Sequence, residues 1–179
     1  MDDNLLHRLE NTVRTVPNFP IDGIMFRDIT PILADGELLA EIVEEMVKKI
    51  SGLNWSPTHI VGPESRGFIF GAMVALQMGI GFIPVRKPGK LPYLLERVEY
   101  NLEYGQNILE IHKDALNDGD RVVIVDDLLA TGGTVAASAQ LCQRLEASVL
   151  GGIFLIELDG LNGSKMSGIE THSLMNYPA

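Results

Sequence analysis

Apolar residues recur along the chain at the three- and four-residue spacing that places them on one side of a helix. The longest such stripe runs from Leu38 to Ile50, and Glu41, Glu44 and Lys48 occupy positions opposite to it. A helix that packs its apolar side against a core has this pattern. By the same criterion, helices are predicted over residues 5–13, 38–50, 67–78 and 135–146.

Short apolar runs separate these helices. The clearest is Arg121–Val125, whose consecutive valine and isoleucine residues suit a strand buried on both faces. Between residues 94 and 111, apolar positions such as Val98 and Tyr100 alternate with polar ones, as in a half-exposed hairpin with its turn at Glu103–Gln106. Further strands are predicted over residues 58–62, 81–85 and 149–158.

The order of these elements predicts the fold class. Strands that alternate with helices form parallel sheets with helices on their faces, so we expect an α/β protein with a central, mainly parallel sheet flanked by helices. At 179 residues, the chain is predicted to form one domain over residues 1–179. Three prolines between Val16 and Pro31 predict a loop there, and the last twenty residues give only weak signals.

One uncharged stretch, residues 67–85, is long enough to raise the question of a membrane span. It contains four glycines, Gln77 and Pro84, and a buried helix followed by a buried strand explains it better than a span does. The N-terminal residues lack the basic start and apolar core of a secretory signal. We therefore expect a cytoplasmic protein without membrane contact.

Charge narrows the classes of partner. The chain carries 24 acidic and 14 basic residues, for a formal net charge of −10, which argues against nucleic-acid binding and against anionic membranes. By itself the balance also disfavours a polyanionic ligand, but residues 62–90 hold four basic residues and one acid, a local net of +3. The single cysteine, Cys142, excludes an internal disulfide framework and a multi-cysteine metal site.

The candidate chemistry is concentrated in Val122–Thr134, where a buried strand runs into two carboxylates and a T-G-G-T turn before the next helix. Ligands of open parallel sheets bind beyond the carboxyl ends of strands. The Gly132 and Gly133 amides, the threonine hydroxyls and the helix N-terminus form a cradle suited to a phosphate. Asp126 and Asp127 would repel that phosphate, so they must face hydroxyl groups or help to hold a divalent cation. A ribose 5-phosphate has both features, whereas the Walker and dinucleotide fingerprints are missing.

This motif resembles the phosphoribosyl pyrophosphate loop of the type I phosphoribosyltransferases, and its exact residue sequence looks like that of the adenine-specific members. Four further segments follow in the family's order and spacing. The resemblance covers nearly the whole chain and is weakest over the last twenty residues. The four segments are Phe26–Thr30, Glu64–Phe68, Arg86–Pro92 and Leu102–Gly105.

The resemblance implies a function in purine salvage, in which the 5-phosphoribosyl group of phosphoribosyl pyrophosphate is transferred to adenine, giving AMP and pyrophosphate. It implies Mg²⁺ that is carried by the substrate rather than bound directly by the protein, and it implies a homodimer. It also adds to the expected fold a small base-binding hood, to which about residues 1–34 contribute, and a flexible hairpin lid.

The resemblance further implies a role for each matched residue. The ribose 5-phosphate is held by Asp126, Asp127, Ala130, Thr131, Gly132, Gly133 and Thr134. The pyrophosphate is held by Glu64, Ser65, Arg66, Arg86, Lys87 and Lys90, with a cis peptide between Glu64 and Ser65. Adenine lies against Met25, Phe26, Arg27 and Leu158. The catalytic residues are Asp126, Asp127 and Glu103, of which Glu103 handles a purine ring proton under a lid that excludes water.

Two alternative functions remain open at this point. One is the same transfer to an oxopurine base, which a site would select with hydrogen-bond donors where adenine needs an acceptor. The other is a non-catalytic regulator that senses phosphoribosyl pyrophosphate. The chain has no basic arm or spare DNA-binding region, and it keeps the segments implied for the hood and the lid, so the second alternative is the weaker one.

Overall fold

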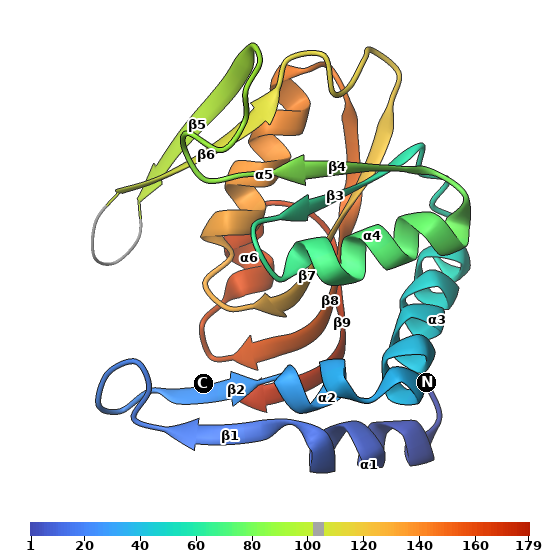
Figure 1. Ribbon diagram of the computed structural model, residues 1–179, viewed down its shortest axis with the longest axis vertical. Helices are drawn as coiled ribbons and strands as arrows, with labels where there is room; N and C mark the ends of the chain where they lie inside the picture. The colour runs from blue at the N-terminus through green and yellow to red at the C-terminus, as the bar shows by residue number, and fades with distance from the viewer. Residues whose placement is uncertain (102–105) are drawn as a thin grey trace.

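A five-stranded parallel sheet forms the centre of the molecule (Figure 1), in the computed structural model that describes residues 1–101 and 106–179. Its strand order is β4-β3-β7-β8-β9, and every neighbouring pair is parallel. The predicted α/β class with a mainly parallel sheet is therefore confirmed. The strands are β3 (His59–Pro63), β4 (Gly81–Val85), β7 (Arg121–Leu129), β8 (Ser148–Asp159) and β9 (Thr171–Pro178).

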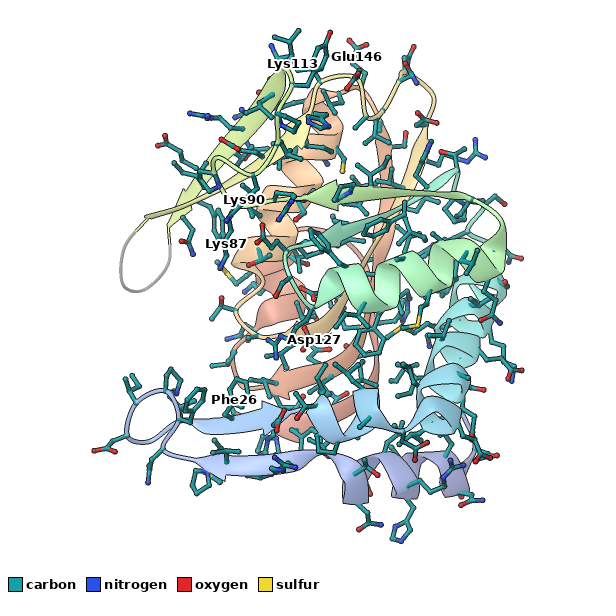
Figure 2. All side chains as sticks on the ribbon, viewed as in Figure 1. Phe26, Lys87, Lys90, Lys113, Asp127 and Glu146 are labelled. Atoms are coloured by element: carbon teal, nitrogen blue, oxygen red, sulfur yellow. The ribbon has the colours of Figure 1, made fainter. Side chains whose placement is uncertain are left out.

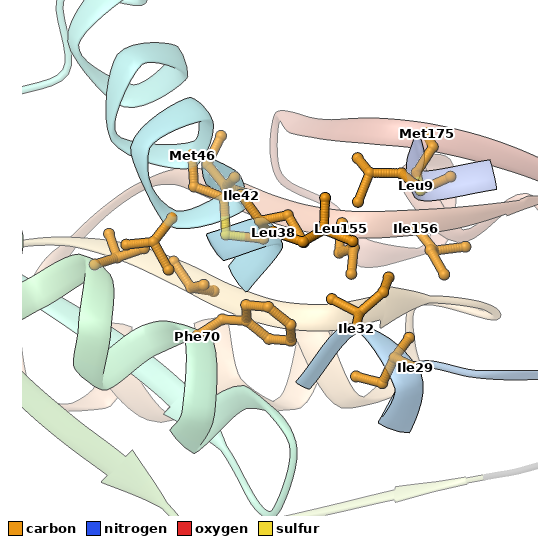
Figure 3. Close-up of a cluster of buried hydrophobic side chains, with 14 of the residues drawn as sticks. Leu9, Ile29, Ile32, Leu38, Ile42, Met46, Phe70, Leu155, Ile156 and Met175 are labelled. Atoms are coloured by element: carbon orange, nitrogen blue, oxygen red, sulfur yellow. The ribbon is translucent and has the colours of Figure 1, made fainter. Parts of the chain in front are cut away.

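Helices cover both faces of this sheet and create two separate apolar cores. One, the α3–α4 core, lies between the sheet and a set of N-terminal helices, and it includes Val123, Val125 and Phe70 (Figure 3). The other, the α5 core, takes the alternate strand positions Val122 and Ile124. The helices are α1 (Asp3–Thr12), α2 (Thr30–Ala34), α3 (Gly36–Gly52) and α4 (Gly67–Met78) on the first face, and α5 (Gly133–Arg144) on the second.

Two antiparallel hairpins lie outside the sheet, at opposite ends of the view in Figure 1. The N-terminal hairpin joins β1 (Arg14–Pro17) to β2 (Met25–Asp28). The second joins β5 (Leu95–Asn101) to β6 (Gln106–His112), as the alternating sequence predicts. Its turn, predicted at Glu103–Gln106, lies largely outside the described residues.

The prediction of a loop between Val16 and Pro31 holds only for residues 18–24, the turn of the N-terminal hairpin, because β1 extends to Pro17, β2 covers Met25–Asp28 and α2 begins at Thr30. Its prolines occupy positions that secondary structure tolerates. Pro17 is the last residue of β1, and Pro31 lies in the first turn of α2, where a missing N–H costs little. Pro20 lies in the turn and follows a cis peptide bond.

Other differences from the predicted elements occur near the ends of the chain and of the strands. The last twenty residues form the short helix α6 (Gly163–Ser167) and the edge strand β9, which the weak sequence signals did not indicate. Strand β7 continues past Val125 to Leu129, since Asp126 and Leu128 still pair with β8. The acidic pair thus lies within the strand rather than after it. Within the part of the chain that the structure describes, no helix is long and apolar enough to cross a membrane.

Candidate functional site

A cavity of about 230 Å³ opens at the carboxyl ends of β3 and β7. This is the edge of a parallel sheet at which ligands generally bind. The cavity brings together segments that are far apart in the sequence, namely the turn after β3, the acidic pair of β7 and the loop that leads into α5. Its lining includes Glu64, Ser65, Arg66, Asp126, Asp127, Ala130, Thr131, Gly132 and Thr134.

The T-G-G-T turn forms the floor of this cavity. Gly132 has a φ of +80°, a left-handed conformation that glycine adopts without strain, and it is the N-cap of α5. A Cβ atom at Gly132 would collide with the carbonyl oxygen of Gly163 and would lie 2.9 Å from the backbone nitrogen of Ser167. The N-terminus of α5, whose first N–H groups have no partner within the helix, therefore borders the cavity, and α6 packs against the turn.

The acidic pair lies at the cavity wall, where Asp127 is buried and Asp126 is half-buried. Arg66 Nη1 lies 3.0 Å from Asp127 Oδ2, and the Asp127 side chain is only 3 % exposed. Asp126 Oδ1 accepts a hydrogen bond of 2.8 Å from the backbone N–H of Asp127. Burial raises the pKa of Asp127, although the Arg66 guanidinium opposes that rise. Burial and the neighbouring Asp127 charge raise the pKa of Asp126 well above its ordinary value.

The raised pKa of Asp126 predicts how stability depends on pH. A folded-state pKa above the ordinary 3.8 means that the ionised carboxylate destabilises the fold at neutral pH. Asp126→Asn removes this charge and keeps an oxygen for the Asp127 N–H. We expect the variant to unfold about 2–4 °C above the unmodified protein at pH 7.5, the shift that about 1 kcal/mol gives in a chain of this size.

The difference in unfolding temperature should shrink as the pH falls from the raised pKa of Asp126 toward the ordinary 3.8, and it should vanish only below that value, where the unfolded chain also binds the proton. Thermal unfolding followed by circular dichroism from below pH 3.8 up to pH 8 measures this. A variant that is less stable than the unmodified protein at pH 7.5, or a difference that does not change with pH, contradicts the prediction.

The basic loop Arg86–Lys90 follows β4 at the same edge of the sheet. Glu64 Oε2 accepts hydrogen bonds from Arg86 Nε at 3.2 Å and from the backbone N–H of Lys87 at 3.0 Å. These two donors hold the pKa of Glu64 below its ordinary value. The Glu64 carboxylate is therefore engaged in placing the loop. The cis peptide between Glu64 and Ser65, which the family resemblance implies, is confirmed.

A second cavity, of about 460 Å³, lies between the N-terminal hairpin and Arg66. Phe26 and Phe19 form an apolar wall, with their ring centroids 5.1 Å apart in an edge-to-face arrangement. Arg66 lines both cavities, and its guanidinium carbon lies 5.9 Å from the Phe26 ring centroid. In Figure 2 the labelled Asp127 lies between Phe26 on one side and Lys87 and Lys90 on the other. The two cavities are thus neighbours that share one cation.

Not every residue implied for the site lines these two cavities. Met25 is 42 % exposed on β2 and lines neither cavity. The Arg27 guanidinium lies over the Tyr177 ring at 4.5 Å and donates to Thr15 Oγ1, which ties the N-terminal hairpin to β9. Leu158 is the penultimate residue of β8 and packs beside the α3–α4 core. Glu103 lies outside the residues that the structure describes.

Tyr100 is a site residue that the motifs did not identify. Its hydroxyl lies 3.2 Å from Thr134 Oγ1, so β5 of the second hairpin reaches the T-G-G-T turn. Tyr100 also lines a third cavity, of about 380 Å³, with Lys87 and Thr134. The sequence indicated only that Tyr100 shares a strand face with Val98, and not that it reaches a turn 34 residues away.

Metal ligation by the protein has little support at this site. Among residues 1–101 and 106–179, no cluster of three or more histidine, cysteine, aspartate or glutamate side chains could hold a metal ion. Asp126 and Asp127 offer two adjacent carboxylates, and one of them is paired with Arg66. Such a donor set suits a Mg²⁺ ion that keeps most of its ligands as water and substrate phosphates.

Comparison with known proteins gives a consistent result. The family model described as a phosphoribosyl transferase domain matches residues 31–168. An adenine phosphoribosyltransferase of Crocosphaera subtropica is 51 % identical over 170 residues, which cover 94 % of this chain and 99 % of that protein.

Solved structures give the same match. The crystal structure of adenine phosphoribosyltransferase from Thermoanaerobacter pseudethanolicus has a TM-score of 0.92 at 48 % identity and covers 96 % of this chain and 99 % of that chain. The Saccharomyces cerevisiae adenine phosphoribosyltransferase, crystallised with an imino-altritol bisphosphate and adenine, has a TM-score of 0.93 at 38 % identity, covering 97 % and 99 % of the two chains.

Proposed function

The chain belongs to the adenine phosphoribosyltransferases, and from this premise we propose how its residues transfer the 5-phosphoribosyl group of phosphoribosyl pyrophosphate to adenine. The observation that carries the proposal is the pair of neighbouring cavities that share Arg66. One cavity has the donors and carboxylates that a ribose 5-phosphate requires. The other is apolar and has the wall that a purine requires.

The 5-phosphate binds in the T-G-G-T turn. The backbone N–H groups of Gly132 and Gly133 and the hydroxyls of Thr131 and Thr134 supply its donors, and the N-terminus of α5 adds a favourable dipole. Ala130 completes the turn. No lysine or arginine is needed there, because the site uses oriented backbone groups instead of side-chain charge.

Asp126 and Asp127 accept hydrogen bonds from the ribose hydroxyls. The reaction passes through a ribose with cationic character at C1, and a carboxylate near that position stabilises the charge that develops. Arg66 holds Asp127 in place and extends from the ribose cavity to the base cavity. Most of the rate enhancement then comes from positioning and electrostatics.

The pyrophosphate leaves toward the basic loop. Arg66, Arg86, Lys87 and Lys90 carry the positive charge, and Ser65 adds a hydroxyl and a backbone group. Glu64 contributes by orienting Arg86 and Lys87. A Mg²⁺ ion bound to the substrate phosphates beside Asp126 and Asp127 would neutralise part of the charge on the leaving group.

Adenine enters the cavity beside the N-terminal hairpin, so that residues 1–34 act as a base hood of the single domain 1–179. Phe26 provides an apolar face for the purine, and backbone groups near Met25 and Arg27 read its edge. Leu158 approaches the other face once the hood closes, since both segments belong to the same side of the molecule. The hairpin β5–β6 acts as the lid, and Glu103, which lies between its two strands in the sequence, is the residue that handles a purine ring proton.

We further propose a cytoplasmic homodimer. Apolar side chains on α4 are exposed, and Leu76 alone is 82 % exposed and borders a shallow apolar pocket with Met73 and Val43. A second copy of the chain is the occupant that would remove this surface from water. Sedimentation at micromolar concentration and fractionation of cells test the two parts of this proposal. A monomer, or a membrane-associated protein, contradicts it.

The test of the function is product identification with a panel of bases. The purified protein, phosphoribosyl pyrophosphate and Mg²⁺ are incubated with adenine, hypoxanthine, guanine or xanthine, and the nucleotides are separated. We expect AMP from adenine at a kcat/KM at least 100-fold above that of any oxopurine, and a large loss of rate when a chelator removes Mg²⁺. Preferred use of an oxopurine overturns the choice of base, and no nucleotide from any base leaves a sensor as the function.

A further inference from the structure

Glu110 is a buried carboxylate for which the transfer reaction, as described above, has no use. It lies on β6 and is 0 % exposed. Its Oε1 accepts a hydrogen bond of 2.7 Å from Arg97 Nη2 on β5, and its Oε2 accepts one of 3.1 Å from the backbone N–H of Gly89. One side chain therefore contacts both strands of the lid hairpin and the basic loop.

The backbone of Glu110 contacts the same loop at its other end. The Arg86 N–H donates to the Glu110 carbonyl oxygen at 2.8 Å, and the Glu110 N–H donates to the Arg86 carbonyl oxygen at 2.7 Å. The main chain thus holds the first residue of the loop, while the carboxylate holds Gly89. Lys87 and Pro88 are enclosed between these two points, and Lys90 follows directly.

The basic loop needs such restraint for electrostatic reasons. Arg86, Lys87 and Lys90 repel one another at close spacing, and a flexible loop would separate them. Two carboxylates hold the loop from the protein side, since Glu64 accepts from the Lys87 N–H and Glu110 accepts from the Gly89 N–H. Both bind backbone N–H groups. The Lys87 and Lys90 ammonium groups have no ion-pair partner among the residues whose positions are described, and so are available to an anion.

A carboxylate at a fully buried position carries a large desolvation cost, which is offset only by charge-assisted contacts. Arg97 offsets that cost and also fixes which way the carboxylate points. Glu110 consequently joins the hairpin to the loop through hydrogen bonds to Arg97 on one side and to Gly89 and Arg86 on the other.

We propose that Glu110 is a positioning residue for pyrophosphate, which sets the place of Lys87 and Lys90 through Gly89 and couples that place to the lid hairpin. This inference rests on the proposed function, because it takes the basic loop to be the pyrophosphate site. The proposed role of Glu110 concerns only the pyrophosphate end of phosphoribosyl pyrophosphate. The 5-phosphate and ribose contacts belong to β7 and α5, whereas the hydrogen bonds of Glu110 among the described residues go to Arg97, Gly89 and Arg86.

The experiment compares binding of the two ends of the substrate in three variants. Glu110→Ala removes the link, and Glu110→Gln keeps one acceptor oxygen for Gly89 but loses the charge that holds Arg97. Glu96→Ala is the matched control, since Glu96 is a carboxylate of the same hairpin that pairs with Arg144 and Lys113 rather than with the loop. Magnesium pyrophosphate and AMP are titrated separately against each protein, and thermal unfolding is recorded.

We expect Glu110→Ala to weaken pyrophosphate binding at least 10-fold and Glu110→Gln three- to fivefold, while AMP binding changes less than twofold in both. Glu96→Ala should leave both affinities within twofold. Equal weakening of pyrophosphate and AMP, or unchanged pyrophosphate binding in Glu110→Gln, overturns the proposal even if Glu110→Ala fails to fold.

AMP formation by the unmodified enzyme is measured first, which separates the two conclusions. An unmodified chain that makes no AMP contradicts the proposed function itself. A chain that makes AMP, with variants that bind pyrophosphate normally, contradicts only the role of Glu110.

Discussion

Asp127→Asn should lower kcat/KM for phosphoribosyl pyrophosphate by about 100-fold, mainly through kcat. The substitution replaces a carboxylate that is almost fully buried and that pairs with Arg66 at 3.0 Å. A preorganised group that stabilises charge in a transition state contributes about 2.7–4 kcal/mol, and about 2.7 kcal/mol corresponds to a 100-fold loss of rate. That contribution is lost at one atom, while the shape of the side chain is kept.

Steady-state kinetics at saturating adenine measures this effect. Asp114→Asn is the matched control, because it makes the same chemical change at an exposed position after β6, and its kcat/KM should stay within twofold. Thermal unfolding of both variants checks that the fold is intact. Wild-type kcat/KM in Asp127→Asn would show that Asp127 has no part in the reaction.

Gly132→Ala should cost at least 100-fold in kcat/KM and lower the unfolding temperature by about 5 °C. The new Cβ meets two backbone groups of the α6 segment, the Gly163 carbonyl and the Ser167 nitrogen, and backbone cannot move aside as cheaply as a side chain. The φ of +80° adds roughly 1–2 kcal/mol of strain for a residue with a Cβ, and about 2 kcal/mol corresponds to such a shift in this size class. The phosphate-binding amides move with the turn, and misplacement by about 1 Å can cost 100-fold in rate.

A substitution at a second glycine distinguishes the effect of backbone strain from the effect of the Cβ contact with α6. Gly168 ends α6 with a φ of +71°, and a Cβ there meets nothing within 4 Å. Gly168→Ala therefore carries the conformational strain alone, with a small loss of stability and kcat/KM within twofold of the unmodified enzyme. If the two alanine variants lose activity equally, strain rather than contact with α6 explains the effect. If Gly132→Ala keeps full activity, the turn does not depend on its support.

The sequence predicted the parts of the fold that repeat apolar residues at a fixed period. The α3 stripe from Leu38 and the apolar run of β7 appear in the structure close to where the pattern placed them. Strand β9 escaped prediction because polar residues such as Asn176 and His172 break its pattern. At an edge of a sheet, hydrogen bonding to a single neighbour decides the conformation, and periodicity carries little of that information.

The site residues likewise fall into those that the sequence could predict and those that it could not. The acidic pair and the T-G-G-T turn are contiguous in the sequence, so their joint chemistry could be predicted, and the structure places them in one cavity with Arg66. Glu110 and Tyr100 could not be assigned, because their partners Gly89 and Thr134 lie 21 and 34 residues away. Only the folded chain shows which carboxylate of a charged hairpin faces inward.

The separation of the two cores has a consequence for how such an enzyme can change. The N-terminal hairpin and its helices rest on the α3–α4 core, whereas the β5–β6 hairpin rests on the α5 core. Among the described residues, the strands β3, β4, β7 and β8 contribute to both cores. Arg66 lines both cavities, but the base hood and the lid hairpin rest on different packing. Substitutions that retune base selectivity can accumulate on one face without altering the packing on which pyrophosphate release depends.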